Sequence, residues 1–182
     1  MDKYIDKEKI KTDLLTFTIQ GVENFLFKNQ NLEFYAFAYD CNSEYAEVNL
    51  CFNTELDLKK TLEHYQKGEF SKYYQSENEI KDLKFNTGDW DYQCFETTNV
   101  LSDEQLTKIF NDLPDDDYKS WNEFIEYLTK IFCECLIDFT KTETYKKIPK
   151  TNDFLAFCID HDEDFEDAIE RLETIKSNYA SR

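Results

Sequence analysis

The sequence predicts an α/β protein of the α+β type, a single-domain sandwich in which a small mixed or antiparallel β-sheet is flanked by amphipathic helices. Apolar residues recur at helical spacing in some segments and at strand spacing in others. Phe, Leu, Ile and Val make up 47 of the 182 residues, enough for a chain of this length to bury a core. With only three glycines and two prolines, tight turns are few and helices should dominate. We therefore expect one globular domain over residues 1–182.

The N-terminal part predicts one helix followed by two strands. Apolar side chains at helical spacing predict a long amphipathic helix over 6–28. Residues 32–39, LEFYAFAY, are apolar at both odd and even positions, which predicts a strand covered on both faces. Residues 46–52 alternate apolar and polar side chains, so they predict a strand with one core face. The DCNSE segment at 40–44 is expected to form the hairpin loop between the two strands.

The middle of the chain is its least regular part. Thr54 and Asp57 are spaced as in a capping box and Gly68 suits a helix end, so a helix is expected from Thr54 to Gly68. The segment that follows predicts a short helix near 77–83 and one or two strands around 83–86 and 91–96.

The C-terminal part predicts two helices, a strand and a closing helix. Ser102 with Gln105 is a second capping signal and marks the start of the first of these helices. One long helix near 115–140 follows, and its apolar stripe is wider than a coiled-coil seam, which favours packing against the sheet. Residues 154–159, FLAFCI, predict another strand covered on both faces, and helical spacing over 165–172 predicts the last helix.

The charge of the chain restricts its partners. There are 39 acidic and 21 basic side chains, a formal net charge of -18 at pH 7. Such a charge repels phosphate backbones and anionic bilayers and attracts basic partners, so we expect no direct binding to nucleic acid and no membrane association. The N-terminal MDKYIDKEKIK lacks the apolar core of a secretory signal, and no stretch approaches 18 consecutive apolar residues. A soluble, cytoplasmic protein is expected.

The usual metal patterns are not met. Five of the six cysteines lie inside or beside apolar runs, which favours buried thiols over disulfides. Cys133 and Cys135 are two apart on a predicted helix, so their side chains diverge, and neither histidine lies at metal-finger spacing. Asp160, Asp162 and Asp164 mimic the start of a calcium loop, but its sixth and twelfth positions are not Gly and Glu. No metal and no cofactor are expected.

Catalytic patterns are equally weak. His64 and His161 are the only imidazoles available for acid-base chemistry, and no Ser or Cys is paired with His161 by a nucleophile motif. Glycines at 21, 68 and 88 alone cannot form a phosphate-binding loop. We expect no catalytic residue and no enzyme. A hydrolase that uses the carboxylates around His161 is the alternative with the least support.

The first candidate for partner binding is the segment after Gly88. We expect a positive φ at this glycine, after which Trp90 and Tyr92 project to one face and Asp89 and Asp91 to the other. Aromatic anchors surrounded by charge are typical of protein interfaces. The structural alternative is that Trp90 and Tyr92 are core residues at the end of the sheet.

The second candidate is the acidic turn after the last predicted strand. Between Asp153 and Glu173 there are nine acids and a single base, Arg171. A basic protein partner would suit this turn, and the predicted contact residues are Asp160, Asp162, Glu163 and Asp164. Acids near a helix N-terminus also gain a few tenths to about 1 kcal/mol from the helix dipole, which explains them without a partner.

Three blocks of the sequence resemble an uncharacterised bacterial family, domain of unknown function 4303. They are YAFAYDCNSEYAEVNLCFNTEL at 35–56, LKFNTGDWDYQ at 83–93 and DFLAFCIDHDEDFEDAIERLE at 153–173. Within them, the recurring marks of the family are the Asn53-Thr54 pair, the turn at 88–90 and the acid-rich turn after the last strand. The resemblance extends over nearly the whole chain.

The resemblance carries no established activity, but it implies a class of partner. Small acidic bacterial proteins of this kind often resemble the immunity proteins of polymorphic toxin systems. The implied function is an immunity protein, acting as a monomer or weak dimer, that occludes a basic toxin such as a nuclease through an acidic surface. The alternative is a non-enzymatic binding or scaffold module whose acidic residues serve solubility and helix capping.

Overall fold

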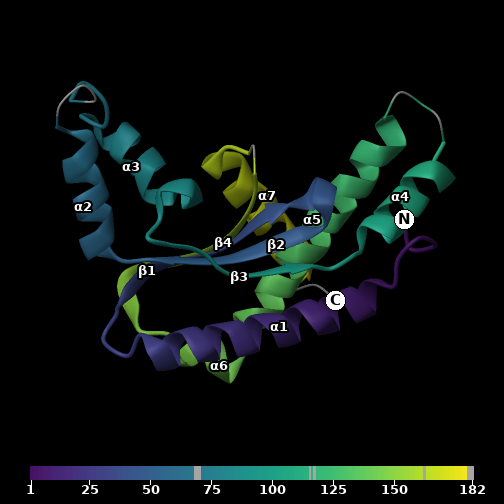
Figure 1. The fold of residues 1–182 in the computed structure, drawn as a ribbon, viewed down its shortest axis with the longest axis horizontal. Coiled ribbons are helices and arrows are strands. Elements are labelled where there is room, and N and C mark those ends of the chain that lie inside the picture. Colours follow the sequence, from purple (N-terminus) through teal and green to yellow (C-terminus); the bar gives the residue numbers. More distant parts are fainter. Residues whose placement is uncertain (68–70, 115, 117, 162, 180–182) are drawn as a thin grey trace.

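A four-stranded mixed sheet forms the centre of the protein (Figure 1). The computed structural model describes residues 1–67, 71–114, 116, 118–161 and 163–179. Within them, the strands follow the spatial order β3-β2-β1-β4, and their bounds are β1 Phe34–Asn42, β2 Glu47–Asn53, β3 Tyr92–Asn99 and β4 Lys150–Asp160. Strand β1 pairs antiparallel with β2 and parallel with β4, and β2 pairs antiparallel with β3. The predicted mixed sheet is confirmed.

Helices cover both faces of this sheet, which confirms the predicted single-domain α+β sandwich. The described part of the chain contains seven α-helices, α1 Lys7–Lys28, α2 Glu55–Tyr65, α3 Glu77–Phe85, α4 Asp103–Asp112, α5 Lys119–Phe139, α6 Glu143–Lys147 and α7 Phe165–Tyr179. Two short 3-10 turns, η1 Ser43–Tyr45 and η3 Thr87–Asp89, lie before β2 and β3. Among the described helices, none is both long enough and apolar enough to cross a bilayer.

Helices α1 and α5 pack on one face of the sheet. The ring of Phe139 in α5 lies 5.3 Å from that of Phe37 in β1, measured between centroids. At Gly21, α1 approaches the sheet so closely that a Cβ atom there would lie 2.9 Å from Cδ1 of Leu50. The long helix therefore packs against the sheet, as predicted, and it also contacts α1.

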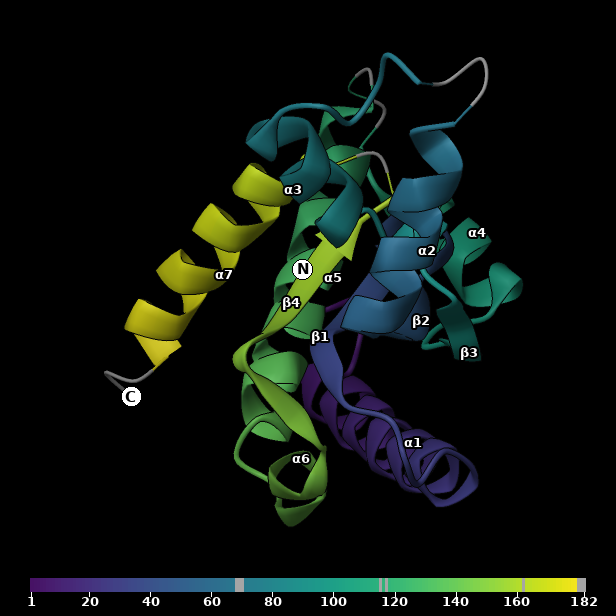
Figure 2. The ribbon, with the colours of Figure 1, turned by 90° about the vertical axis from the view of Figure 1, so that its left-hand side faces the viewer.

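The opposite face is covered by α3, by η3 and by the start of α7. Trp90, directly after η3, is 2% exposed, and its ring lies 5.9 Å from that of Tyr35 and 5.8 Å from that of Phe157. Its indole N–H donates to the carbonyl of Lys84 at 3.0 Å, which ties α3 to the sheet. Figure 2 shows α7 along the β4 edge of the sheet, beside α5.

The prediction that β2 has one core face is wrong. Asn49 and Cys51, on the side expected to be open, are only 9% and 0% exposed. Strand β3 contacts both side chains, since Thr97 Oγ1 donates to Asn49 Oδ1 at 2.6 Å and the Cys94 N–H donates to Cys51 Sγ at 3.2 Å. Alternation in the sequence indicates which face of a strand is polar, but tertiary contacts decide whether that face is exposed.

Two predictions for irregular segments are also wrong. Residues 83–86, predicted as a strand, form the end of α3 and its C-cap, because a capping box of Ser76 and Glu79 starts a helix that continues through them. The predicted hairpin loop at 40–44 is shorter than expected, since β1 extends to Asn42 before η1 begins.

Boundaries differ in the later elements as well. The long helix begins at Lys119, after the predicted start, because Tyr118 has a left-handed φ of 64°. Helix α2 ends at Tyr65, and its expected end, Gly68, lies outside the described residues. Residues 154–159 are fully covered only toward their end, because β4 is an edge strand. Helix α6 has no counterpart among the predicted elements.

Candidate functional site

An acidic groove of about 790 Å³ lies between α5 and α7, and we call it the α5–α7 groove. Its lining comprises Ile125, Glu126, Thr129, Lys130, Glu134, Asp160, Glu163, Asp164, Asp167, Arg171, Thr174, Ile175 and Asn178. Six of these side chains are acidic and two are basic, so the groove is negatively charged. Cavities of this size accommodate several side chains of a partner or a small ligand.

Helical spacing in α7 forms one wall of the groove. Asp167, Arg171, Thr174 and Asn178 are three or four residues apart, so their side chains share one face of the helix. The buried residues that hold α7 against the protein are Ala168, Leu172 and Ile175. The amphipathic pattern therefore places one stripe in the core and presents another to the groove.

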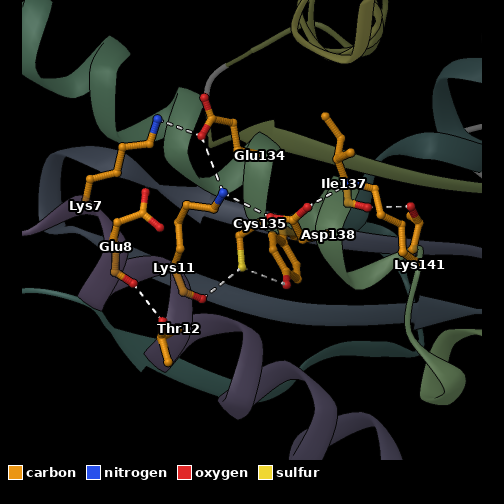
Figure 3. Close-up of polar contacts among 11 residues, drawn as sticks. Lys7, Glu8, Lys11, Thr12, Glu134, Cys135, Ile137, Asp138 and Lys141 are labelled. Carbon is orange, nitrogen blue, oxygen red and sulfur yellow. Dashed lines mark hydrogen bonds and ion pairs between the residues drawn. The ribbon is translucent and has the colours of Figure 1, made fainter. Parts of the chain in front are cut away.

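Glu134, at one side of the groove, is neutralised by lysines of α1 (Figure 3). Its side chain is 2% exposed, and its Oε2 lies 2.7 Å from Lys7 Nζ and 3.7 Å from Lys11 Nζ. Lys11 Nζ also lies 3.0 Å from Asp138 Oδ2. These ion pairs join α1 to α5, so Glu134 serves the fold and its charge is already balanced.

Asp160 and Glu163, two of the predicted contact residues, also have internal partners. Asp160 accepts hydrogen bonds from the backbone N–H groups of Ser43 at 3.2 Å and His161 at 2.9 Å. Glu163 accepts from the backbone N–H of Asp160 at 3.1 Å and forms an ion pair with Arg171. Their carboxylates line the groove but hold the strand-to-helix turn in place.

The exposed acids of the groove are Glu126, Asp164 and Asp167. Among the residues that the structure describes, no lysine or arginine forms an ion pair with any of the three. Of the three predicted acids of the turn that the structure describes, Asp164 is thus the one that faces the groove with an exposed carboxylate. Asp162 lies outside the described residues.

The other predicted segment is built differently from the prediction. Gly88 lies in η3 with a φ outside the left-handed region, so the expected positive φ is wrong. The turn is made instead by Asn86, whose side chain accepts from the Gly88 N–H at 3.2 Å. Trp90 is a core residue, as the structural alternative stated, and it cannot serve as an exposed anchor in this structure.

Trp90 and Tyr92 do not share a face. Tyr92 pairs with Phe52 in the sheet, so its half-buried ring follows that residue toward α1, 5.3 Å from the ring of Phe25. Asp89 accepts from the hydroxyl of Tyr65 at 2.7 Å, and Asp91 is exposed.

Asp91 lies beside Asp57, whose carboxylate pairs with Lys60 at 2.6 Å. Burial first, and then the charge of Asp57, raise the pKa of Asp91. Of Asp89 and Asp91, Asp91 is the exposed one. The negative charge of Asp57 disfavours its ionised form.

A smaller cleft of about 300 Å³ brings parts of the two predicted segments together. Asn86 and Thr87, just before Gly88, line it with Asp160 and His161 of the acidic turn. Asp91 and Tyr92 are not among its lining residues. The two segments therefore meet through their turns, and the aromatic residues contribute to the core.

Sequence reasoning missed Glu126 and Asp167 as groove residues. A signal was present for both, because Asp167 lies three residues after Asp164 and Glu126 lies three residues before Thr129 on a helix. Which helix faces which neighbour, however, cannot be read from spacing alone.

The fold and the groove define an α+β protein with a four-stranded mixed sheet and an acidic cleft between two helices. The family model described as domain of unknown function (DUF4303) matches residues 14–177. The chain belongs to the DUF4303 family. Searches of the curated proteins and of the solved structures found no match.

Proposed function

We propose that this protein is a non-enzymatic binding protein whose α5–α7 groove accepts a positively charged segment of a protein partner. The observation that supports this most directly is the exposure of Glu126, Asp164 and Asp167 around one groove. Complementary charge steers association and selects partners. The same charge disfavours nucleic acid as a direct ligand, because phosphates are repelled.

The groove combines the two features that a lysine or arginine side chain needs. Ile125 and Ile175 supply apolar contact for its methylene stem, and the exposed carboxylates can accept hydrogen bonds from its charged end. A groove that served only solubility would need no apolar residues between its acids.

Within this class, we propose an immunity protein that neutralises a basic toxin by occlusion. The formal charge of -18 supports this proposal, because it attracts a basic partner. Occlusion also requires only binding, so no catalytic group is needed. A cationic toxin, such as a nuclease, would offer a basic active-site surface to the groove. The toxin would then lose access to its own substrate.

The test expresses the protein encoded by the neighbouring open reading frame, which the proposal predicts to be a cationic toxin. Its binding is measured by calorimetry at low and high salt, together with rescue of cells that express it. The test variant is Glu126→Lys with Asp167→Lys. The matched control is Glu123→Lys with Glu170→Lys, which makes the same charge change on the same two helices at exposed positions outside the groove.

We expect the test variant to lose toxin binding and rescue, and the control variant to retain most of both. Binding by the unchanged protein should weaken as salt rises. Equal loss in both variants would mean that only net charge matters. Unchanged binding in both would favour the scaffold alternative, and a chain that binds no adjacent toxin would contradict the immunity function.

A further inference from the structure

Three strands bring Asp40, Cys51 and Cys94 together on the sheet face opposite α1. A carboxylate oxygen and the two Sγ atoms all lie within 4.8 Å of one another. We propose that these residues bind a thiolate-preferring divalent metal ion of the Zn²⁺ class. None of the three lines the α5–α7 groove, so this site is separate from the proposed partner-binding surface.

A β-bulge places Cys94 in the cluster. The register between β2 and β3 shifts between Leu50 and Phe52, so the bulge in β3 lies opposite Cys51. Cys94 has a φ of 47°, a left-handed conformation that is unfavourable for a residue with a side chain. In this conformation its backbone N–H donates to Cys51 Sγ at 3.2 Å. Bulges of this kind often aim a side chain at a functional site.

The donor set suits zinc. Zinc binds Cys sulfur at about 2.3 Å and carboxylate oxygen at about 2.0–2.2 Å, which puts tetrahedral ligand atoms about 3.5–3.8 Å apart. The limit of 4.8 Å in this cluster leaves only small side-chain rotations to reach that geometry. Cys94 is exposed, so an ion has an entry path and a fourth position open to water or to a partner's side chain.

Two of the three ligands already have outer-shell partners. The hydroxyl of the buried Thr87 lies beside Asp40, and the backbone N–H of Cys94 donates to Cys51 Sγ. Such outer-shell bonds orient metal ligands in proteins. In the described part of the chain, no lysine or arginine forms an ion pair with the half-buried carboxylate of Asp40. A bound cation would supply the missing positive charge.

A second group of thiols serves as a contrast. Cys41 and Cys158 lie 3.6 Å apart, with Cys133 beside Cys158, and all three are buried. Arg171 donates to the carbonyl of Cys158, so a positive charge already lies next to this group. With no entry path and a neighbouring cation, it does not suit a metal ion, and Cys133 provides a control position.

The test uses the full chain, reduced with a phosphine and stripped of metal with a chelator. Zn²⁺ alone is titrated against a chromophoric competitor, and Co²⁺ is used as the spectroscopic probe. We expect one equivalent of metal and an intense thiolate-to-cobalt charge-transfer band. Circular dichroism on each variant verifies that it is folded.

The variants separate ligands from their neighbours. Cys94→Ala, at an exposed position, should abolish the charge-transfer band and weaken zinc affinity by more than the 10–100-fold typical of losing an outer-shell partner. Asp40→Asn should weaken affinity while the band is retained. Thr87→Val removes no ligand and should cost about 10–100-fold. Cys133→Ala and the groove variants should bind zinc like the unchanged chain.

Three results would overturn the proposal. These are a fully reduced chain that does not bind zinc, a folded Cys94→Ala variant that binds it unchanged, and a loss confined to Cys133→Ala. A Cys51–Cys94 disulfide in the purified protein would support the site if reduction restores metal binding, and would overturn it if the reduced protein still binds none.

Discussion

The η3 turn with its following residues and the acidic turn that lines the α5–α7 groove were both predicted to bind a partner, yet they are built in opposite ways. After η3, the largest side chain, Trp90, points into the core at 2% exposure. Along the groove, Asp164 and Asp167 remain exposed. Burying a large aromatic ring stabilises the fold by several kcal/mol, whereas burying an unpaired carboxylate is costly. Proximity of acids and aromatics in sequence therefore does not make a joint surface.

The largest expected effect concerns Trp90. Trp90→Ala should lower the free energy of unfolding by about 3–5 kcal/mol, because it leaves a cavity between Tyr35 and Phe157 and removes the bond to α3. Urea denaturation monitored by circular dichroism measures the change. Asp91→Ala, at an exposed neighbour, should change stability by less than about 0.5 kcal/mol. A loss below 1 kcal/mol for Trp90→Ala would place this residue outside the core, where it could contact a partner.

The next effect distinguishes two acids of the groove itself. Glu134→Ala should cost about 2–3 kcal/mol, because it breaks the pairs with Lys7 and Lys11. The expected cost is smaller than the roughly 3–5 kcal/mol for removing one partner of a fully buried ion pair. The reason is that the side chains of Lys7 and Lys11 are 21% and 13% exposed, so their charges can still be hydrated. Glu126→Ala, eight residues earlier on α5, should leave thermal unfolding almost unchanged. Similar losses in both variants would remove the distinction between structural and exposed acids.

The smallest effect is a pH dependence at the start of α2, beside Asp91. Burial opposes ionisation of Asp57, but hydrogen bonds from Lys60 and Thr54 outweigh it and lower the pKa of this carboxyl. Its stabilising contribution is therefore present above the unfolded pKa of about 3.9 and is lost as pH falls through the lower folded pKa.

Asp57→Asn should accordingly destabilise by about 1 kcal/mol near neutral pH, and the difference should disappear in strong acid. Chemical denaturation of both proteins at neutral and acidic pH measures this. A difference that grows on acidification would reverse the inferred sign.

Local patterns in the sequence were sufficient for much of the architecture. The capping box at Ser102 and Gln105 forms as predicted, with both reciprocal hydrogen bonds at the start of α4. The wide apolar stripe of the long helix packs against the sheet. These features depend on residues three or four positions apart, so short-range spacing contains the information.

Local spacing did not predict which acids of the two candidate binding segments are exposed. Asp160 and Asp164 are close in sequence, but only the second has an exposed carboxylate, because the first accepts hydrogen bonds from the backbone of Ser43 and His161. Glu126 was missed because its role depends on α7 lying beside α5. Contacts between elements far apart in the chain decide which charges are balanced.

By itself, the sequence determined the class of fold, the order of most elements and the strong negative charge, since these follow from composition and local periodicity. Only the tertiary structure decided that Trp90 is core, that α5 and α7 enclose a groove, and that Asp40, Cys51 and Cys94 meet. The physical reason is that burial and strand pairing bring together residues that are far apart along the chain, and local sequence patterns do not predict such contacts.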